Sequence, residues 1–404
     1  MVRLSKRVLL NYRSRKIDAM FARRLKIHAI YLVLVALSGC LGNSSVDIGT
    51  TRGAGSTPKV LRVVATTGMV ADMVRHVVGT HGEVTGLIGS GVDPHLFKAT
   101  RHDIKQLQEA DVVFYSGLML EGRMQDALQQ ANRSRQPAIA VTARLDKTSL
   151  RSPPEFEGHY DPHVWMDVAA WSRCVDGVVE TLTTSDPVHA DEYRQNGKDY
   201  QSELAKLDDY VRQVIESIPA SQRVLVTAHD AFGYFGRAYG IEVRSVQGVT
   251  TESEAGVHDV NRLVDFLVER KLPAIFVESS VNEKNIRAVI EGTESRHAKV
   301  RIGGELFSDA MGAEGTYEGT YIGMLDHNAT QIARALGGTA PEKGLNGRLG
   351  LKRNASKGGL TIVLAIVFSA ALFVAIVVMS DAIAANFRAT TRKVKGVFLA
   401  NRVA

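Results

Sequence analysis

Residues 186–218 read DPVHADEYRQNGKDYQSELAKLDDYVRQVIESI, and this run predicts one long helix near the middle of the chain. Asp186 is a plausible N-cap, and Pro187 suits the first helical turn. At about 1.5 Å per residue, such a helix would extend roughly 45 Å, the length of a whole domain. A helix of this length can join two separate lobes, so this segment predicts a two-lobed chain.

Short apolar runs alternate with amphipathic runs on both sides of this helix. The predicted strands are 60–66, 83–88, 110–116, 138–141, 223–227, 242–246, 273–278 and 299–302. The predicted helices are 69–78, 101–109, 124–131, 168–182, 257–270, 283–291 and 317–336. This alternation is typical of parallel sheets covered by helices. We therefore predict an α/β fold with an N-terminal lobe at 58–185, a linking helix at 186–218 and a C-terminal lobe at 219–337.

Charge is distributed unevenly along the 404 residues, whose formal net charge is +6. Residues 1–26 hold nine Lys/Arg and one Asp, and residues 341–404 hold ten Lys/Arg and two acids. Each end therefore carries +8 and the part between them carries −10. An acidic globular part has no basic patch to offer phosphates, which argues against a nucleic-acid partner. Basic ends beside apolar runs indicate a membrane instead.

The N-terminal segment has the pattern of an export signal. Residues 27–37 form a mostly apolar run of signal-peptide length, and Leu37-Ser38-Gly39-Cys40 follows. This tetrapeptide resembles the lipobox of a bacterial lipoprotein, which implies a signal peptide at 1–39 and a lipidated Cys40. A short membrane anchor that ends in a cysteine by chance is the alternative, and Met1 and Met20 both remain open as the start. The Ser/Gly/Thr-rich residues 40–57 suit a flexible tether.

The C-terminal segment predicts a second membrane attachment. A linker at 338–358 precedes twenty residues without a charge, 360–379. At about 1.5 Å per residue this run matches the hydrocarbon thickness of a bilayer. We therefore expect a transmembrane helix at 359–380, followed by a basic tail at 381–404.

Four scattered side chains are candidate metal ligands. His95 and His163 each end the tripeptide Asp-Pro-His, and the proline stiffens the loop that carries the imidazole. His229 directly follows a predicted strand, and Asp309 comes just past another, where ligands of open α/β sheets bind. Three imidazoles and a carboxylate suit a borderline divalent cation. Because more than sixty residues separate successive candidates, each one taken singly fits a structural role as well.

The residues around these four positions resemble a known family. The stretches are Asp93-Pro94-His95, Tyr160-Asp161-Pro162-His163-Val164-Trp165, the run 227–235 (TAHDAFGYF) and the run 306–312 (LFSDAMG). They are similar to motifs of the cluster A-I (TroA-like) solute-binding proteins of metal ABC transporters, over about residues 58–337. The resemblance implies two α/β lobes linked by one long helix, with Zn or Mn bound between them. It assigns His95 and His163 as ligands from the first lobe, and His229 and Asp309 as ligands from the second.

The function that the resemblance implies is capture of a divalent metal ion outside the cytoplasm and its delivery to an ABC permease. We expect no enzyme activity, because four protein ligands would close the open position that a catalytic metal needs. A metal-dependent hydrolase and an adhesin-like surface lipoprotein are the alternatives. We expect a membrane-anchored monomer on the periplasmic side, with permease subunits and the membrane as partners.

The sequence leaves the metal and the residues around it open. Many manganese-binding members of the family have Glu where His229 stands, whereas zinc-binding members often have a His-rich loop before the second ligand. Residues 147–158 contain no histidine, so Zn and Mn both remain plausible. Asp167 and Asp230 could either orient imidazoles or cap helices.

Overall fold

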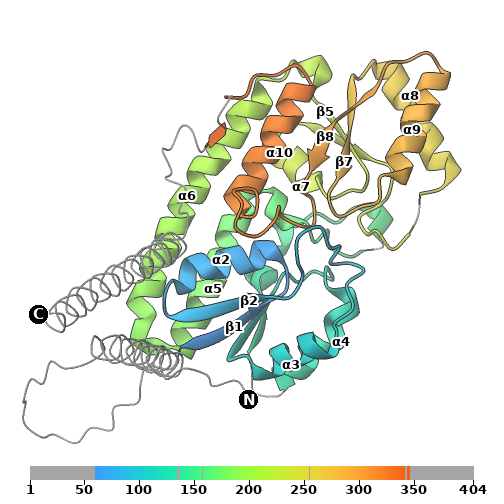
Figure 1. Cartoon of the computed structure of the whole chain (residues 1–404). Helices are drawn as coiled ribbons and strands as arrows, with labels where there is room; N and C mark the ends of the chain where they lie inside the picture. The colour runs from blue at the N-terminus through green and yellow to red at the C-terminus, as the bar shows by residue number, and fades with distance from the viewer. Residues whose placement is uncertain (1–59, 134–136, 157, 254, 342–343, 346–404) are drawn as a thin grey trace, which may run out of the picture. The chain divides into compact units, whose positions relative to one another are not determined.

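The computed structural model describes residues 60–133, 137–156, 158–253, 255–341 and 344–345 (Figure 1). Its strands are β1 (Leu61–Ala65), β2 (Gly82–Gly86), β3 (Val112–Tyr115), β4 (Ala138–Ala140), β5 (Val224–Thr227), β6 (Glu242–Ser245), β7 (Ala274–Glu278) and β8 (Arg301–Leu306). Its α-helices are α2 (Gly68–Val78), α3 (Arg101–Glu109), α4 (Gln125–Arg133), α5 (Val168–Ser185), α6 (Ala190–Glu216), α7 (Gly233–Tyr239), α8 (Val257–Arg270), α9 (Lys284–Ser295) and α10 (Tyr321–Ala335). We call β1 to α5 the first lobe and β5 to α10 the second lobe.

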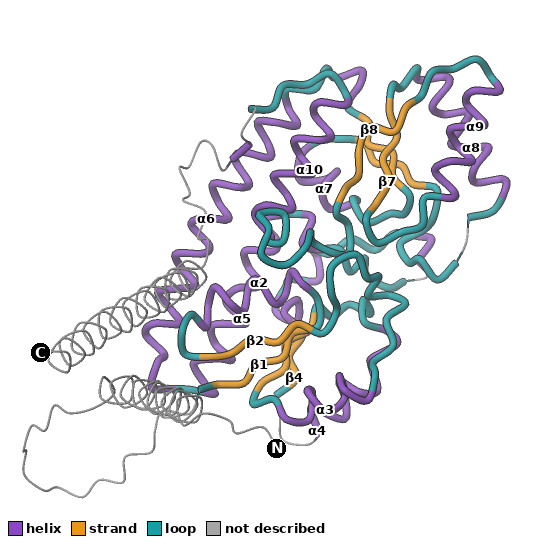
Figure 2. Tube along the Cα trace, in the orientation of Figure 1, coloured by secondary structure: helices purple, strands orange, loops and turns teal. Residues whose placement is uncertain are grey.

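The first lobe is built on a four-stranded parallel sheet in the order β2-β1-β3-β4. Side chains of β1 alternate between its two faces, as the pleat of a strand requires. Val63 joins the cluster formed with α2 and α5, whereas Val64 joins the cluster formed with α3 and α4. The sheet is therefore covered by helices on both faces, as Figure 2 shows.

The second lobe repeats this arrangement with two parallel strand pairs, β5-β6 and β7-β8. Val226 and Ile275 pack with residues of α8 and α9, whereas Leu225 and Phe276 belong to the cluster that contains α10. The carboxyl ends of parallel strands point the same way, so the loops that follow them gather at one edge of each sheet.

Helix α6 joins the two lobes and begins after a Pro187-led 3-10 turn, Pro187–His189. Its 27 residues extend about 40 Å at 1.5 Å per residue. Buried residues recur every three or four positions along it: Tyr193, Gly197, Tyr200, Leu204, Leu207, Tyr210, Val211, Val214 and Ile215. Figure 1 shows the helix running the length of both lobes, beside α5 and α10. The predicted two α/β lobes and long linking helix are therefore present.

One part of the predicted fold class is corrected. In the part of the chain that the structure describes, no helix combines the length and the apolar character needed to cross a bilayer. The segment predicted as a transmembrane helix, 359–380, lies outside the described residues, as do the predicted signal peptide at 1–39, Cys40 and the tether at 40–57. That prediction rested on apolar length alone, which is a property of the sequence and not of an observed helix. The fold class supported here is two α/β lobes joined by one helix.

Candidate metal centre

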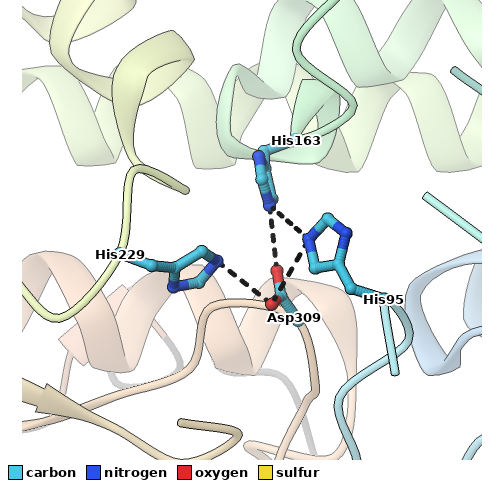
Figure 3. Close-up of side chains that lie close together, drawn as sticks. All are labelled: His95, His163, His229 and Asp309. Atoms are coloured by element: carbon cyan, nitrogen blue, oxygen red, sulfur yellow. Dashed lines mark hydrogen bonds and ion pairs between the residues drawn. The ribbon is translucent and has the colours of Figure 1, made fainter. Parts of the chain in front are cut away.

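The four predicted side chains meet at one point between the lobes (Figure 3). One ligand atom from each of His95, His163, His229 and Asp309 lies within 4.8 Å of the other three. The Nε2 atoms of His95 and His163 are 3.3 Å apart. Asp309 Oδ1 is 3.2 Å from His163 Nε2, and Asp309 Oδ2 is 3.1 Å from His229 Nε2. All three imidazoles therefore present the same ring nitrogen to the centre of the cluster.

Each of these side chains stands on a loop at the sheet edges. His95 lies in the loop between β2 and α3, and His163 directly precedes the 3-10 turn Val164–Met166 that leads into α5. His229 comes two residues after β5, and Asp309 comes three residues after β8. Two loops of the first lobe and two of the second thus contribute one side chain each.

Burial is nearly complete at this centre. His163 and His229 are 0% exposed, Asp309 is 1% exposed and His95 is 6% exposed. Both oxygens of Asp309 and His229 Nε2 are buried, and none makes a hydrogen bond of good geometry with the described part of the chain. Buried polar atoms in folded proteins normally have partners, and a cation between these atoms would supply one.

Carboxylates hold two of the imidazoles from behind. Asp161 Oδ1 accepts hydrogen bonds from the backbone N–H of His163 at 2.9 Å and from His163 Nδ1 at 2.8 Å. Glu278 Oε1 accepts from the backbone N–H groups of Ala228 and His229 at 2.8 and 2.9 Å, and Glu278 Oε2 is 2.6 Å from His229 Nδ1. A carboxylate at Nδ1 keeps the proton on that nitrogen and leaves Nε2 free to bind a cation.

The third imidazole is held through its backbone and by a contact from the other lobe. Asp93 Oδ1 accepts the backbone N–H of His95 at 2.8 Å. The other oxygen of Asp93 accepts the Thr251 hydroxyl at 2.5 Å, and next to it Arg123 Nε donates to Glu252 at 3.0 Å. The loop between β6 and α8 therefore closes the second lobe against the loops of the first lobe, next to the most exposed ligand candidate.

Burial and charge move the pKa values of the two first-lobe imidazoles in opposite directions. Burial lowers the pKa of His95 to about 3, against the smaller opposing effect of the Asp309 charge. Burial also lowers the pKa of His163, but the hydrogen bond to Asp161 and the charges of Asp161 and Asp309 outweigh it and raise this pKa to about 9. Without a cation, His95 is therefore neutral at pH 7, whereas His163 holds a proton.

The second-lobe pair behaves as a buried ion pair when no cation is bound. Burial lowers the pKa of His229, yet the charges of Glu278 and Asp309 raise it well above its usual range. Burial raises the pKa of Asp309, yet the charges of His229 and His163 hold it well below its usual range. A divalent cation at this point would supply the positive charge that the two protons otherwise provide.

Reasoning from the sequence missed the side chains that orient the imidazoles. Asp167 caps α5 by accepting the backbone N–H of Ala170 at 2.9 Å, so the capping alternative holds for it. Asp161 and Glu278 hold the rings instead. The repeated Asp-Pro-His tripeptide carried a signal for Asp161, because an Asp side chain can bond the backbone two residues on. Glu278 ends β7, whereas His229 follows β5, and no local sequence pattern indicates that these two residues are in contact.

Comparison with known proteins gives the family. The model of the family described as "Zinc-uptake complex component A periplasmic" (ZnuA) matches residues 63–335, which covers both lobes and all four clustered side chains. The chain belongs to this family. ZnuA-family proteins are substrate-binding proteins of transport systems.

Two curated relatives of the ZnuA family match most of the folded part. The chain is 47% identical over 309 residues to the manganese-binding lipoprotein MntA of Bacillus subtilis, covering 76% of this chain and 97% of that protein. It is 48% identical over 274 residues to the zinc-binding protein TroA of Treponema pallidum, covering 68% and 88%. The solved structure of the periplasmic zinc binding protein TroA from T. pallidum superposes with a TM-score of 0.67 at 47% identity, over 69% of this chain and 99% of that one.

Proposed function

We propose that this chain captures one divalent metal ion, Zn or Mn, with His95, His163, His229 and Asp309 and delivers it to an ABC permease. The observation that carries the proposal is the buried carboxylate of Asp309, whose oxygens lie 3.1 to 3.9 Å from the Nε2 atoms of three histidines. Family membership supports the same function, since the relatives are metal-binding proteins by name. Neither of the alternatives, a hydrolase or an adhesin-like lipoprotein, has support of this kind.

Capture suits this centre better than catalysis does. A catalytic zinc site usually keeps three protein ligands and an open position for water. Here four side chains converge, and each is at most 6% exposed. An ion held by all four would have little room for a reacting water and would leave the site chiefly when the lobes part.

The choice between Zn and Mn stays open at this ligand set. Imidazoles suit zinc and carboxylates suit manganese, and the general order of affinities favours Zn²⁺ over Mn²⁺ at a given site. The two relatives are about equally similar to this chain, and one is named for each metal. Protein purified without chelator, followed by competition between Zn²⁺ and Mn²⁺, tests the proposal. Absence of stoichiometric binding of either ion would refute it.

We also propose the cellular setting that the N-terminal sequence indicates. A lipid attached at Cys40 would hold lobes at 58–185 and 219–337, joined by 186–218, outside the cytoplasm and next to the permease. The B. subtilis relative is named a lipoprotein, which supports this setting. Metabolic labelling with a fatty acid, lost in a Cys40→Ala variant, tests it.

Metal binding should release protons at neutral pH. An imidazole must lose its proton before Nε2 can bind a cation, and His163 has a pKa of about 9 in the metal-free protein. Since the metal-free site holds the proton below this pKa, affinity should rise with pH between about 6 and 9. Calorimetry at pH 7 in two buffers of different ionisation enthalpy should show release of about one to two protons per ion. Proton release of zero would contradict the assignment of His163.

Replacing Glu278 with glutamine should weaken metal binding by about ten- to a hundredfold, the usual cost of losing a partner that orients a ligand. The reason is that Glu278 lies 2.6 Å from His229 Nδ1 and also accepts two backbone N–H groups. A matched control is Glu305→Gln, on the exposed side of β8. Equal affinity of the Glu278 variant and the control would show that this carboxylate does not position His229.

A further inference from the structure

A single arginine lies between the carboxylate that orients His163 and the second lobe. Arg151 Nη1 donates to Asp161 Oδ2, while the other oxygen of Asp161 accepts both bonds from His163. Arg151 Nη2 lies 3.7 Å from Asp230 Oδ2, and Asp230 directly follows His229. One guanidinium thus connects the support of a first-lobe imidazole with the loop that carries a second-lobe imidazole.

The second lobe also provides a seat for this guanidinium. The Arg151 backbone N–H donates to the Tyr234 hydroxyl at 3.0 Å, and that hydroxyl donates to the backbone carbonyl of Asp161 at 3.0 Å. The guanidinium carbon lies 5.8 Å from the centre of the Tyr234 ring. A Cβ at Gly233 would overlap the guanidinium, so the position of Arg151 depends on a glycine at the start of α7.

The positive charge of Arg151 stabilises the buried, negatively charged side chain of Asp161. The Asp161 side chain is 0% exposed, and a buried carboxylate is costly unless it is paired and hydrogen-bonded. The planar fork of an arginine can hold two partners at fixed positions, which a lysine cannot do. Arg151 itself keeps 25% of its side chain exposed, in a cavity of about 920 Å³ between β6, α7 and α8. Replacing Arg151 with a shorter side chain would therefore enlarge this cavity and would not create a closed void in the hydrophobic core.

We propose that Arg151 is a positioning residue that ties the orientation of His163 to the seating of the second lobe on the first. It holds Asp161 in the geometry that aims His163 Nε2 at the ion, and it can do so only while Gly233 and Asp230 are in place. Separation of the lobes would remove this support and loosen one ligand. The inference rests on the proposed function, because it concerns the release of a metal bound by His163.

Three variants and one control test this role. Arg151→Gln removes the charge, Arg151→Lys keeps the charge without the fork, and Gly233→Ala keeps the arginine but fills its seat. Arg237→Gln is the matched control, because Arg237 lines the same cavity and lies 4.9 Å from the same Tyr234 ring, yet pairs with Asp167 and not with Asp161. The measurements are zinc release into excess chelator by stopped flow, the visible spectrum of the Co²⁺-loaded protein, and the melting temperature of the metal-free protein.

Arg151→Gln should release zinc about ten- to a hundredfold faster and shift the Co²⁺ spectrum, whereas Arg237→Gln should do neither. Gly233→Ala should reproduce both effects, and combining it with Arg151→Gln should add nothing, because the two changes remove one interaction. Arg151→Lys should recover only part of the loss. A purely structural role would instead lower the melting temperature with release rate and spectrum unchanged, which would overturn the proposal.

The outcomes also separate this inference from the proposed function. If the wild-type chain binds neither Zn²⁺ nor Mn²⁺, or if His163→Ala leaves binding intact, both fail. If the wild type binds zinc and His163→Ala does not, but Arg151→Gln and Gly233→Ala release zinc at the rate of Arg237→Gln, the role of Arg151 alone is refuted. Should Arg151→Gln fail to fold, Gly233→Ala and Arg151→Lys carry the same test.

Discussion

Replacing His163 with alanine should weaken metal binding at least about a hundredfold while the chain still folds. A four-ligand zinc site contributes roughly 12 kcal/mol, so one ligand accounts for about 3 kcal/mol, or more than a hundredfold in Kd. His163 is the most informative of the four, because its ring is fully buried and its Nε2 is close to both His95 and Asp309. Competition against a chromogenic chelator measures the change.

The control for this substitution is His327→Ala. His327 is a histidine of the second lobe whose Nε2 bonds only the backbone carbonyl of Glu305, at 3.0 Å and on the exposed side of the chain. The His327→Ala variant should bind metal with the affinity of the wild-type chain. Far-UV circular dichroism should show both variants folded. An affinity of His163→Ala within threefold of the control would remove His163 from the ligand set.

Metal should raise the melting temperature of the wild-type chain by roughly 10 °C when the free ion is at a thousand times its Kd. Binding to the folded state alone stabilises by about 4 kcal/mol at that excess, and a domain of this size gains about 2–4 °C per kcal/mol. The physical source is the metal-free cluster, in which the Asp309 oxygens and His229 Nε2 are buried without hydrogen bonds. Differential scanning calorimetry with and without Zn²⁺ measures the shift.

Two controls make this measurement specific. Mg²⁺ prefers oxygen ligands in octahedral geometry and keeps its waters, so it should leave the melting temperature unchanged at the same concentration. His163→Ala should lose most of the shift with Zn²⁺. Equal shifts with Zn²⁺ and Mg²⁺, or an undiminished shift in His163→Ala, would mean that the ion acts elsewhere on the chain.

Much of the fold could be predicted from local patterns. The bounds of α3 and α8 follow from the sequence without error, because a capping box or an N-terminal acid begins each helix and its apolar spacing is regular. Helix α7 was missed, since its seven residues include Gly233 and Gly236, which are poor helix formers. It forms because Tyr234, Phe235 and Tyr239 bury their rings against other elements, which is a tertiary cause.

The candidate ligands could be predicted, and their supports could not. His95 and His163 each end the same tripeptide, and His229 follows a predicted strand, so each candidate ligand has a recognisable local sequence pattern. The oxygen of Asp93 that meets Thr251 and the Arg151 contact with Asp230 join residues far apart in the chain. Such pairings depend on how two lobes are seated on each other, and no periodicity or local spacing records them.

A crystal structure of the zinc-loaded protein, with anomalous data collected on both sides of the zinc absorption edge, would locate the bound ion directly. We expect one strong anomalous peak, with His95 Nε2, His163 Nε2, His229 Nε2 and an oxygen of Asp309 each about 2.0–2.3 Å from it. A peak bound by any other set of side chains, or a cluster of these four that stays empty at saturating zinc, would contradict this ligand assignment.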